Sequence, residues 1–333
     1  MKVSIAMTTY NGEKYVEEQL NSLLNQTRKP DEVIIFDDHS TDDTPNIVRK
    51  FINDNEISNW FFYVNEKNLG YKENFYKAIL KTTGDIIFLC DQDDIWYYNK
   101  IDVMIDKFLR NGNIKVLNTS FEYIDGENKK IDIVLNEKYS NNNLIKMPVE
   151  NNDLIKIPFK DICCYGISPG CTMAFTKEIK DIYIKNSQLK IVHDWEINFI
   201  GAIYDSLYFF NIKTIKYRIH GDNVMGITDV NGKLSFKDKL DIKNRLAEVE
   251  KNYFISINLK GYYDFLSKEK KSSLDDQVKF NELRLNAFKD RSIFTLLKVY
   301  KYYGIYKKSN SLKGRLADLV CLFFPKKLLK KGV

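Results

Sequence analysis

Short apolar segments alternate with amphipathic helical segments along the first ninety residues, and this pattern constrains the fold more than any other feature. Apolar runs predict strands at residues 3–7, 33–36, 60–64 and 85–90. The residues between them have helical spacing, and the first predicted helix presents Val16, Leu20 and Leu23 and is capped by Asn11. Strands that alternate with helices at this spacing predict a parallel sheet covered on both faces.

Carboxylates follow two of these strands at the point where each strand ends. Asp37 and Asp38 end the second, while Asp91, Asp93 and Asp94 end the fourth. Parallel sheets bind ligands beyond the carboxyl ends of their strands. Carboxylates packed this closely repel one another unless a cation is present, and Mg²⁺ or Mn²⁺ commonly bridges carboxylates and phosphates. The segment therefore predicts a metal site, with a solvated acidic turn as the alternative.

The remainder of the chain predicts a second half of the sheet and then a helical region. Residues 129–159 are irregular and Asn-rich, and we interpret them as a loop on the acceptor side of the site. A strand at 171–175, a helix at 194–203 and a strand at 207–210 follow. The expected division is a domain of residues 1–230, with halves at about 1–110 and 111–230, and a helical region of residues 231–333.

Positive charge is concentrated at the C-terminus. The chain carries 51 basic and 45 acidic residues, a net +6, and residues 311–333 account for +5 of it. This distribution does not indicate nucleic-acid binding by the whole protein. Leucine and phenylalanine are interleaved with the basic residues, so the segment predicts an amphipathic tail that lies on an anionic membrane. A helix docked on its own domain is the alternative.

Cysteine usage and hydropathy bear on the compartment. The five cysteines show no zinc-type spacing, which favours reduced thiols. No apolar run approaches the roughly 18–20 residues that span a bilayer, and the N-terminus does not resemble a signal peptide. We therefore expect a cytoplasmic protein, with a peripheral contact at the inner face of the cell membrane through its tail.

A series of short motifs resembles one enzyme family. The motifs include the sequences SIAMTTYN, DQDDIW, HDW and YRIHGDN, and together they occupy residues 4–11, 34–42, 68–70, 84–85, 91–96, 170–175, 193–195 and 217–223. In this order they are similar to family-2 glycosyltransferases of the GT-A fold, of the type that assembles bacterial polysaccharides. The DQDDIW, HDW and YRIHGDN forms resemble rhamnosyltransferases most. The resemblance implies a Rossmann-like, mostly parallel sheet flanked by helices, with a C-terminal helical appendage.

The resemblance implies roles for residues at the donor and the metal. Thr8, Tyr10 and Asp37 or Asp38 would hold the base and ribose, and Asp91 would face the ribose or the metal. The principal ligand of Mn²⁺ or Mg²⁺ would be Asp93, and His220 would reach the metal or the diphosphate. A core histidine is the alternative for His220.

The resemblance also implies roles at the acceptor. Asp194 matches the family's catalytic base, with a helix N-cap as the alternative reading. Gly170 would let the backbone approach the donor sugar or the acceptor. A base opposite the leaving group predicts inversion at the anomeric carbon.

The predicted function is transfer of a sugar, L-rhamnose being one candidate, from a dTDP- or UDP-sugar to a saccharide or lipid-linked saccharide in surface polysaccharide biosynthesis. A carboxylate in the Asp37/Asp38 turn can accept the imide proton of uracil or thymine. A nucleotidyltransferase would carry a glycine- and arginine-rich loop, which residues 8–14 lack, and a dinucleotide-dependent oxidoreductase would carry GxGxxG after its first strand. A non-catalytic sugar-binding protein is the third alternative.

Overall fold

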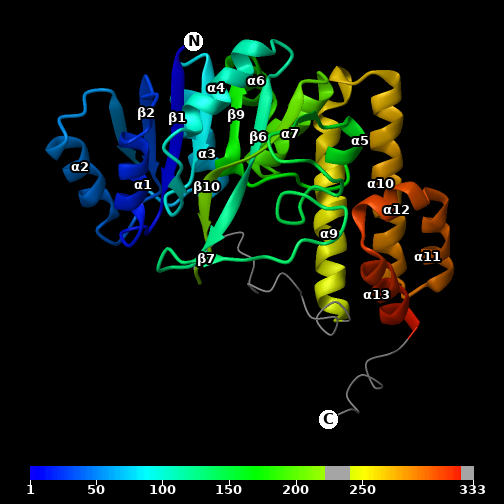
Figure 1. Ribbon diagram of the computed structural model, residues 1–333. Helices are drawn as coiled ribbons and strands as arrows, with labels where there is room; N and C mark the ends of the chain where they lie inside the picture. The colour runs from blue at the N-terminus through cyan, green and yellow to red at the C-terminus, as the bar shows by residue number, and fades with distance from the viewer. Residues whose placement is uncertain (222–240, 324–333) are drawn as a thin grey trace. The chain divides into compact units, whose positions relative to one another are not determined.

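The structure is a computed structural model that describes residues 1–221 and 241–323. It divides into two compact units (Figure 1). The first contains residues 1–158 and continues from residue 166, and the second contains residues 159–165 and the helices that begin at Ile242. The expected boundary at residue 230 lies outside the described residues and stays a prediction.

The N-terminal half of the first unit follows the predicted alternation closely. Its helices and strands are β1 (Val3–Thr9), α1 (Val16–Leu24), β2 (Glu32–Asp37), α2 (Thr44–Asp54), β3 (Trp60–Val64), α3 (Tyr71–Lys81) and β4 (Ile86–Cys90). The N-cap prediction for Asn11 is wrong, because α1 has Tyr15 at its N-cap position. Asn11 has a φ of 47°, and its side-chain oxygen accepts a hydrogen bond from the Thr41 N–H at 2.8 Å.

The second half of this unit contains shorter strands. They are β5 (Ile95–Trp96), α4 (Lys100–Arg110), β6 (Val116–Ile124), β7 (Lys130–Ile131), β8 (Leu154–Lys156), the 3₁₀ turn η1 (Gly170–Thr172), β9 (Met173–Thr176), α6 (Lys177–Asn186), α7 (His193–Ile203) and β10 (Leu207–Arg218). The Asn-rich loop makes three consecutive left-handed residues, Asn141 to Asn143, a conformation that asparagine tolerates. The three side-chain amides donate to Ile167, Phe121 and Val134 carbonyls.

One mixed sheet runs through the first unit in the order β3-β2-β1-β4-β9-β6-β10-β5. The first four strands are mutually parallel, and β6 is parallel to β10. Strand β9 runs antiparallel between β4 and β6, and β5, β7 and β8 also pair antiparallel with their neighbours, so the sheet is mixed, with β1–β4, β6 and β10 sharing one direction. The strand order changes direction between β1 and β4, and ligands of open α/β sheets bind beyond the strand ends at such a point.

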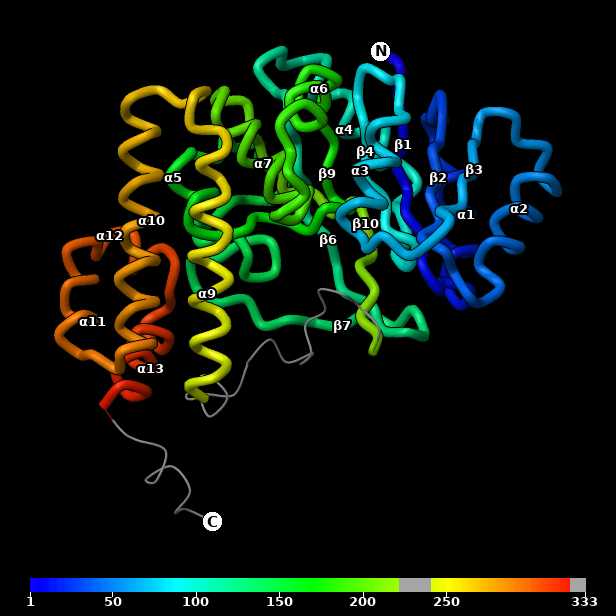
Figure 2. Tube along the Cα trace, turned by 180° about the vertical axis from the view of Figure 1, so that it is seen from behind, coloured from blue at the N-terminus to red at the C-terminus, as the bar shows by residue number. Residues whose placement is uncertain are grey.

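Helices cover both faces of the sheet. Alternation along β1 turns Val3, Ile5 and Met7 to one face, where they join a buried core with apolar residues of α1, α2 and α4. Helix α3 contacts β1 and β2 from the other side and also contacts α6 and α7, which extends that layer to β6 and β10. Figure 2 shows the same helices and strands from behind.

The second unit is helical. It consists of α5 (Phe159–Ile162), α9 (Ile242–Asn258), the 3₁₀ segment η2 (Leu259–Phe265), α10 (Lys268–Lys289), α11 (Ile293–Val299), the 3₁₀ turn η3 (Tyr300–Tyr302), α12 (Tyr303–Ser309) and α13 (Leu312–Phe323). The short helix α5 comes from the middle of the first unit's sequence. It contacts α10, and the Cys164 thiol that follows it donates to Gln277 Oε1 at 3.2 Å.

A single buried carboxylate ties four of these helices together. Asp318 of α13 is fully buried, and it accepts hydrogen bonds from Arg245 of α9, Arg284 of α10 and Tyr306 of α12. Burial alone would raise the pKa of Asp318, but the two guanidinium groups lower it overall. Gly314, Ala317 and Cys321 are buried on the same helix, so residues 312–323 dock on their own unit, which was the alternative to a tail that lies on an anionic membrane. Residues 324–333 of the predicted tail lie outside the described residues.

Candidate functional site

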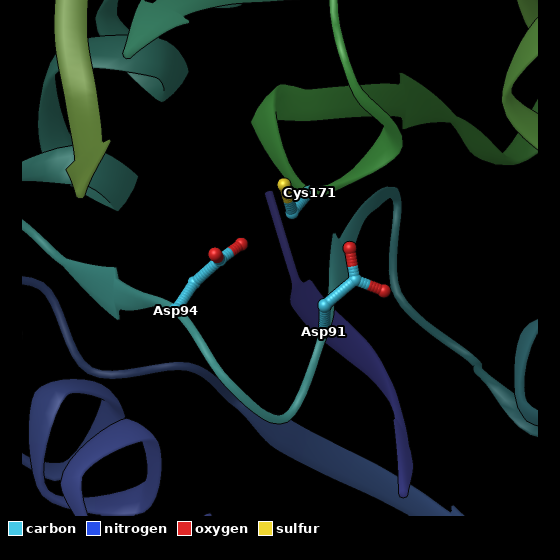
Figure 3. A group of neighbouring side chains, drawn as sticks. All are labelled: Asp91, Asp94 and Cys171. Carbon is cyan, nitrogen blue, oxygen red and sulfur yellow. The ribbon is translucent and has the colours of Figure 1, made fainter. Parts of the chain in front are cut away.

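The acidic loop between β4 and β5 lies at the edge of the sheet where the strand order changes direction. The carboxylates of Asp91 and Asp94 converge there with the thiol of Cys171, which the turn before β9 supplies (Figure 3). One ligand atom from each of the three residues lies within 4.8 Å of the others. Asp94 is 1% exposed and accepts the Arg218 N–H at 3.1 Å. Among the described residues its buried Oδ2 has no hydrogen-bond partner, so this oxygen is available to a cation.

Burial and mutual repulsion destabilise the charged forms of these carboxylates. Burial and the charge of Asp93 raise the pKa of Asp91 to about 7, and the same two causes raise the pKa of Asp94 well above its ordinary value. Lys100 supplies one buried positive charge, although burial lowers its pKa to about 8. The Lys100 ammonium donates to the Cys171 carbonyl and lies 3.5 Å from the centroid of the Trp96 ring. The carboxylates of this loop are therefore stabilised either by protonation or by a bound cation.

The structure brings together two of the three predicted metal ligands. Asp93 Oδ2 and His220 Nε2 are 2.8 Å apart, and both side chains are about one-sixth exposed, at 17% and 15%. The Tyr15 ring lies 5.0 Å from the His220 ring and packs against it. Asp222 and Asn223, which complete the YRIHGDN motif, lie outside the described residues. His220 thus lies beside the acidic loop, and its role as a metal ligand stays a prediction.

Arg218 holds the acidic loop in place, a role that we did not predict from the sequence. Its side chain is fully buried, and Nε donates to the Asp93 carbonyl at 2.7 Å. The other guanidinium nitrogens donate to Asn128 Oδ1 and to Glu18 Oε2, the latter at 2.6 Å. The only sequence signal for this role was an arginine ending an apolar strand, two residues before His220.

Asp194 lies in the first turn of α7, and Gly170 lies beside it. The N-cap position of α7 is Val192, so Asp194 does not cap the helix, although its Oδ1 accepts the Trp195 N–H at 2.6 Å. A Cβ atom added to Gly170 would lie 3.2 Å from Asp194 Cβ and 3.4 Å from His193 Nε2. The charge of Asp194 also contributes to the raised pKa of Asp91, so both carboxylates act on one region. Gly170 therefore accommodates the Asp194 side chain.

His193 has the surroundings of a structural residue. Its ring lies 4.0 Å from the Phe75 ring, and burial lowers its pKa to about 3. The imidazole is therefore neutral at physiological pH. Asp194, next to it, is partly exposed.

The two carboxylates predicted to hold the base are occupied by protein donors. Asp37 is fully buried, and it accepts from Thr9 Oγ1 at 2.8 Å and from the N–H and hydroxyl of Ser40 at 2.8 and 2.6 Å. Asp38 is 2% exposed, and it accepts from the backbone N–H groups of residues 69 and 70, each at 2.8 Å, and from Asn65 at 3.0 Å. These bonds order the loops after β2 and β3, so direct contact with a base stays a prediction.

The loops after β1 and β4 are joined by the side-chain amide of Gln92. It accepts from the Tyr10 N–H at 2.7 Å and donates to the Tyr10 carbonyl at 2.9 Å. This leaves the Tyr10 ring exposed, while Thr8 is buried in β1. A side chain at Gly12 would collide with Gln92, because its Cβ would lie 2.3 Å from Oε1. No sequence pattern indicated this role of Gln92 beyond its place in the DQDD segment.

The sequence of this chain is similar to those of known proteins. Residues 4–168 match the family described as glycosyl transferase family 2. The chain is 31% identical over 246 residues to the dTDP-rhamnosyl transferase RfbG of Shigella flexneri, an alignment that covers 70% of this chain and 76% of RfbG. An uncharacterized glycosyltransferase of Rickettsia bellii is 30% identical over 141 residues, 42% of this chain, but the chain spans only 20% of that protein.

Solved structures share the fold. TarS residues 1–349 of S. aureus, crystallised with UDP-GlcNAc, superpose with a TM-score of 0.54 at 18% identity. The superposition covers 96% of this chain and 91% of the TarS fragment. It confirms the predicted fold class, a mixed α/β sheet flanked by helices with further helices at the C-terminus.

Proposed function

This chain belongs to glycosyl transferase family 2, and from that premise we propose that it is an inverting, metal-dependent transferase whose catalytic base is Asp194. Because the chain belongs to a glycosyltransferase family, we set aside the nucleotidyltransferase and the non-catalytic sugar-binding protein as alternatives. The observation that carries the proposal is the common location of Asp194 and the Asp91–Asp94 loop, on which Asp194 acts electrostatically. A glycosyl transfer needs a base on the acceptor side and charge stabilisation on the diphosphate side.

The residues of the loop fit a divalent cation. They offer several carboxylate oxygens, including the buried Oδ2 of Asp94, which has no hydrogen-bond partner among the described residues, and hard cations prefer oxygen ligands. We propose Mn²⁺ or Mg²⁺ held by Asp91 and Asp93, with His220 beside Asp93 as a further ligand. Bound there, the ion would offset the negative charge that develops on the departing nucleoside diphosphate.

The protein's own residues would carry out the other parts of the transfer. Asp194 is partly exposed in the first turn of α7, and its carboxylate would take the proton of the acceptor hydroxyl as that oxygen attacks the anomeric carbon. Gly170 leaves the space that this carboxylate occupies. Arg218 would hold Asp93 and Asp94 at the diphosphate side through its bond to the Asp93 carbonyl. Attack opposite the leaving group inverts the anomeric configuration.

The donor is proposed to be a dTDP- or UDP-sugar, with L-rhamnose as one candidate. The support comes from RfbG, which is named a dTDP-rhamnosyl transferase, and from the TarS crystal with UDP-GlcNAc. The Asp37 and Asp38 oxygens add little, since protein donors occupy them. Thr8 and Tyr10 remain proposed donor contacts. The acceptor is proposed to be a saccharide or a lipid-linked saccharide of a surface polysaccharide. The enzyme is proposed to be cytoplasmic, with a peripheral contact at the inner face of the cell membrane.

The test of this function is Asp194→Asn. The variant should bind nucleotide with Mn²⁺ as the parent does, yet lose about 10²–10⁴-fold in turnover, because only proton removal is disabled. Asp205→Asn, a matched change at an exposed aspartate just after α7, should keep turnover. Release of nucleoside diphosphate measures turnover, and NMR of the product gives the anomer. Full activity of Asp194→Asn, or a retained anomeric configuration, would contradict the mechanism.

A further inference from the structure

The end of the helical unit carries an unusual number of exposed apolar side chains. Phe294 and Leu297 of α11 are 78% and 54% exposed, and Leu312 and Leu316 of α13 are 64% and 46% exposed. Tyr300 and Tyr303 between them are also exposed. Single exposed apolar residues are ordinary, as on the first unit, where they are scattered over many elements. A group on adjoining short helices calls for a partner.

The short helices that carry these side chains contact one another. Helix α11 contacts α13, and the rings of Tyr300 and Tyr303 stack with centroids 6.1 Å apart. The Arg315 guanidinium of α13 lies 5.8 Å from the centroid of the Tyr303 ring, which links α13 to α12. On α13, Leu312 and Leu316 are four residues apart and therefore lie on one face. We call this surface, made by the exposed residues of 291–323, the aromatic–basic face.

Charge identifies the kind of partner. Residues 291–323 include seven basic side chains and one acidic side chain, Asp318. Asp318 is fully buried and paired with Arg245 and Arg284, so it does not offset the surface charge. Every exposed charge of this segment is therefore positive. Aromatic and aliphatic groups among lysines are the combination that binds at the interface of an anionic bilayer.

We infer that the aromatic–basic face docks the helical unit on an anionic lipid membrane. The face belongs to folded helices, so the contact does not depend on residues 324–333. None of the described helices is long and apolar enough to cross a membrane, and insertion would therefore be limited to the interfacial layer. The inference relies on the proposed function only for its purpose, which is to bring the enzyme to a lipid-linked acceptor.

The test is co-sedimentation of the full chain with vesicles of phosphatidylglycerol and phosphatidylcholine in equal parts, and with phosphatidylcholine alone. An apolar variant (Phe294→Ser, Leu297→Ser, Leu316→Ser) and a charge variant (Lys298→Gln, Lys301→Gln, Lys307→Gln) are compared with a matched control on the first unit (Leu80→Ser, Leu109→Ser, Val134→Ser). A chain ending at Phe323 isolates the contribution of the tail. Circular dichroism and melting temperature show that each variant folds.

Binding should require anionic lipid and should survive in the control and in the shortened chain. The charge variant should partition up to about 100-fold less, since each lysine near an anionic surface contributes about fivefold. The apolar variant should also bind at least about tenfold less, because fewer side chains insert. Unchanged binding of either variant, equal binding to neutral vesicles, or loss of binding only on truncation would overturn the inference. Self-association without lipid that both variants abolish would instead identify an interface between copies, and would also overturn it.

Turnover on a soluble acceptor separates this inference from the proposed function. The variants of the aromatic–basic face should keep it, because no proposed catalytic residue lies in that segment. Absence of turnover in the parent would contradict the function while leaving vesicle binding as a separate result. Variants of the aromatic–basic face that lose vesicle binding but keep turnover would support both the membrane contact and the proposed function.

Discussion

Replacing Gly170 with alanine tests whether the position of Asp194 sets the rate of transfer. The added Cβ would lie 3.2 Å from Asp194 Cβ, which is closer than nine in ten real Cβ contacts. Asp194 must then shift by a few tenths of an ångström. Because a 1 Å misplacement of a reacting group costs about 10²-fold, a shift of this size should lower kcat about three- to tenfold. Gly170 has no left-handed φ, so backbone strain does not complicate the change.

The matched control is Gly166→Ala. Gly166 lies four residues earlier in the same connecting segment, and an added Cβ would meet no atom within 4 Å. Steady-state kinetics should show a lower kcat for Gly170→Ala and parental values for Gly166→Ala. Donor binding, followed by thermal shift with nucleotide and Mn²⁺, should be the same in both. Parental turnover of Gly170→Ala, or a loss confined to donor affinity, would refute the claim that this glycine makes room for the base.

Other substitutions test the metal, the helical unit and the buried histidine. Asp93→Asn should abolish the Mn²⁺-dependent thermal stabilisation by nucleotide, about 2.7 kcal/mol at one hundred times the Kd in the parent, whereas Asp106→Asn on the exposed side of α4 should keep it. Asp318→Asn should cost about 3–5 kcal/mol in urea unfolding of the helical unit, because two buried guanidinium groups lose their buried counterion and keep only the more exposed Glu248. A loss below 1 kcal/mol, similar to that of Asp290→Asn, would contradict this role. The folded-state pKa of His193, about 3, lies below its ordinary value of 6.5, so its stabilising contribution is complete above pH 6.5 and is lost as the pH falls towards 3. Between pH 6.5 and 5 it accounts for about 2 kcal/mol of lost stability, which His193→Gln should abolish.

Local sequence patterns predicted the strands and helices that depend on local interactions. The strand at 60–64 has the predicted limits, because the apolar run that defines it is bounded by polar residues on both sides. The antiparallel direction of β9 was not predictable, since it follows from the path of the long connection before it. Periodicity also cannot show that α5 packs with helices more than a hundred residues later.

Candidate site residues were predictable where chemistry follows from residue type at a strand end. Asp91, Asp93 and Asp94 fall together because strand β4 ends there, and the structure places His220 Nε2 2.8 Å from Asp93 Oδ2. Lys100 and Arg218 were missed because lysine and arginine are ordinarily exposed, and only the tertiary structure buries them. The hydrogen bonds of Asp37 and Asp38 could not be predicted either, because their donors come from distant loops.

The assignment of residues 159–165 to the helical unit limits how this enzyme can be recombined with its relatives. The peptide chain leaves the first unit at Pro158 and returns to it at Gly166, so the helical unit is encoded in two separate stretches of the gene. A chimera made by exchanging only the sequence from α9 onwards would pair α5 with foreign helices. The Lys308–Asp161 ion pair and the Cys164–Gln277 bond would then be lost unless the donor sequence happened to restore them. An exchange that preserves the unit must therefore transplant both stretches together.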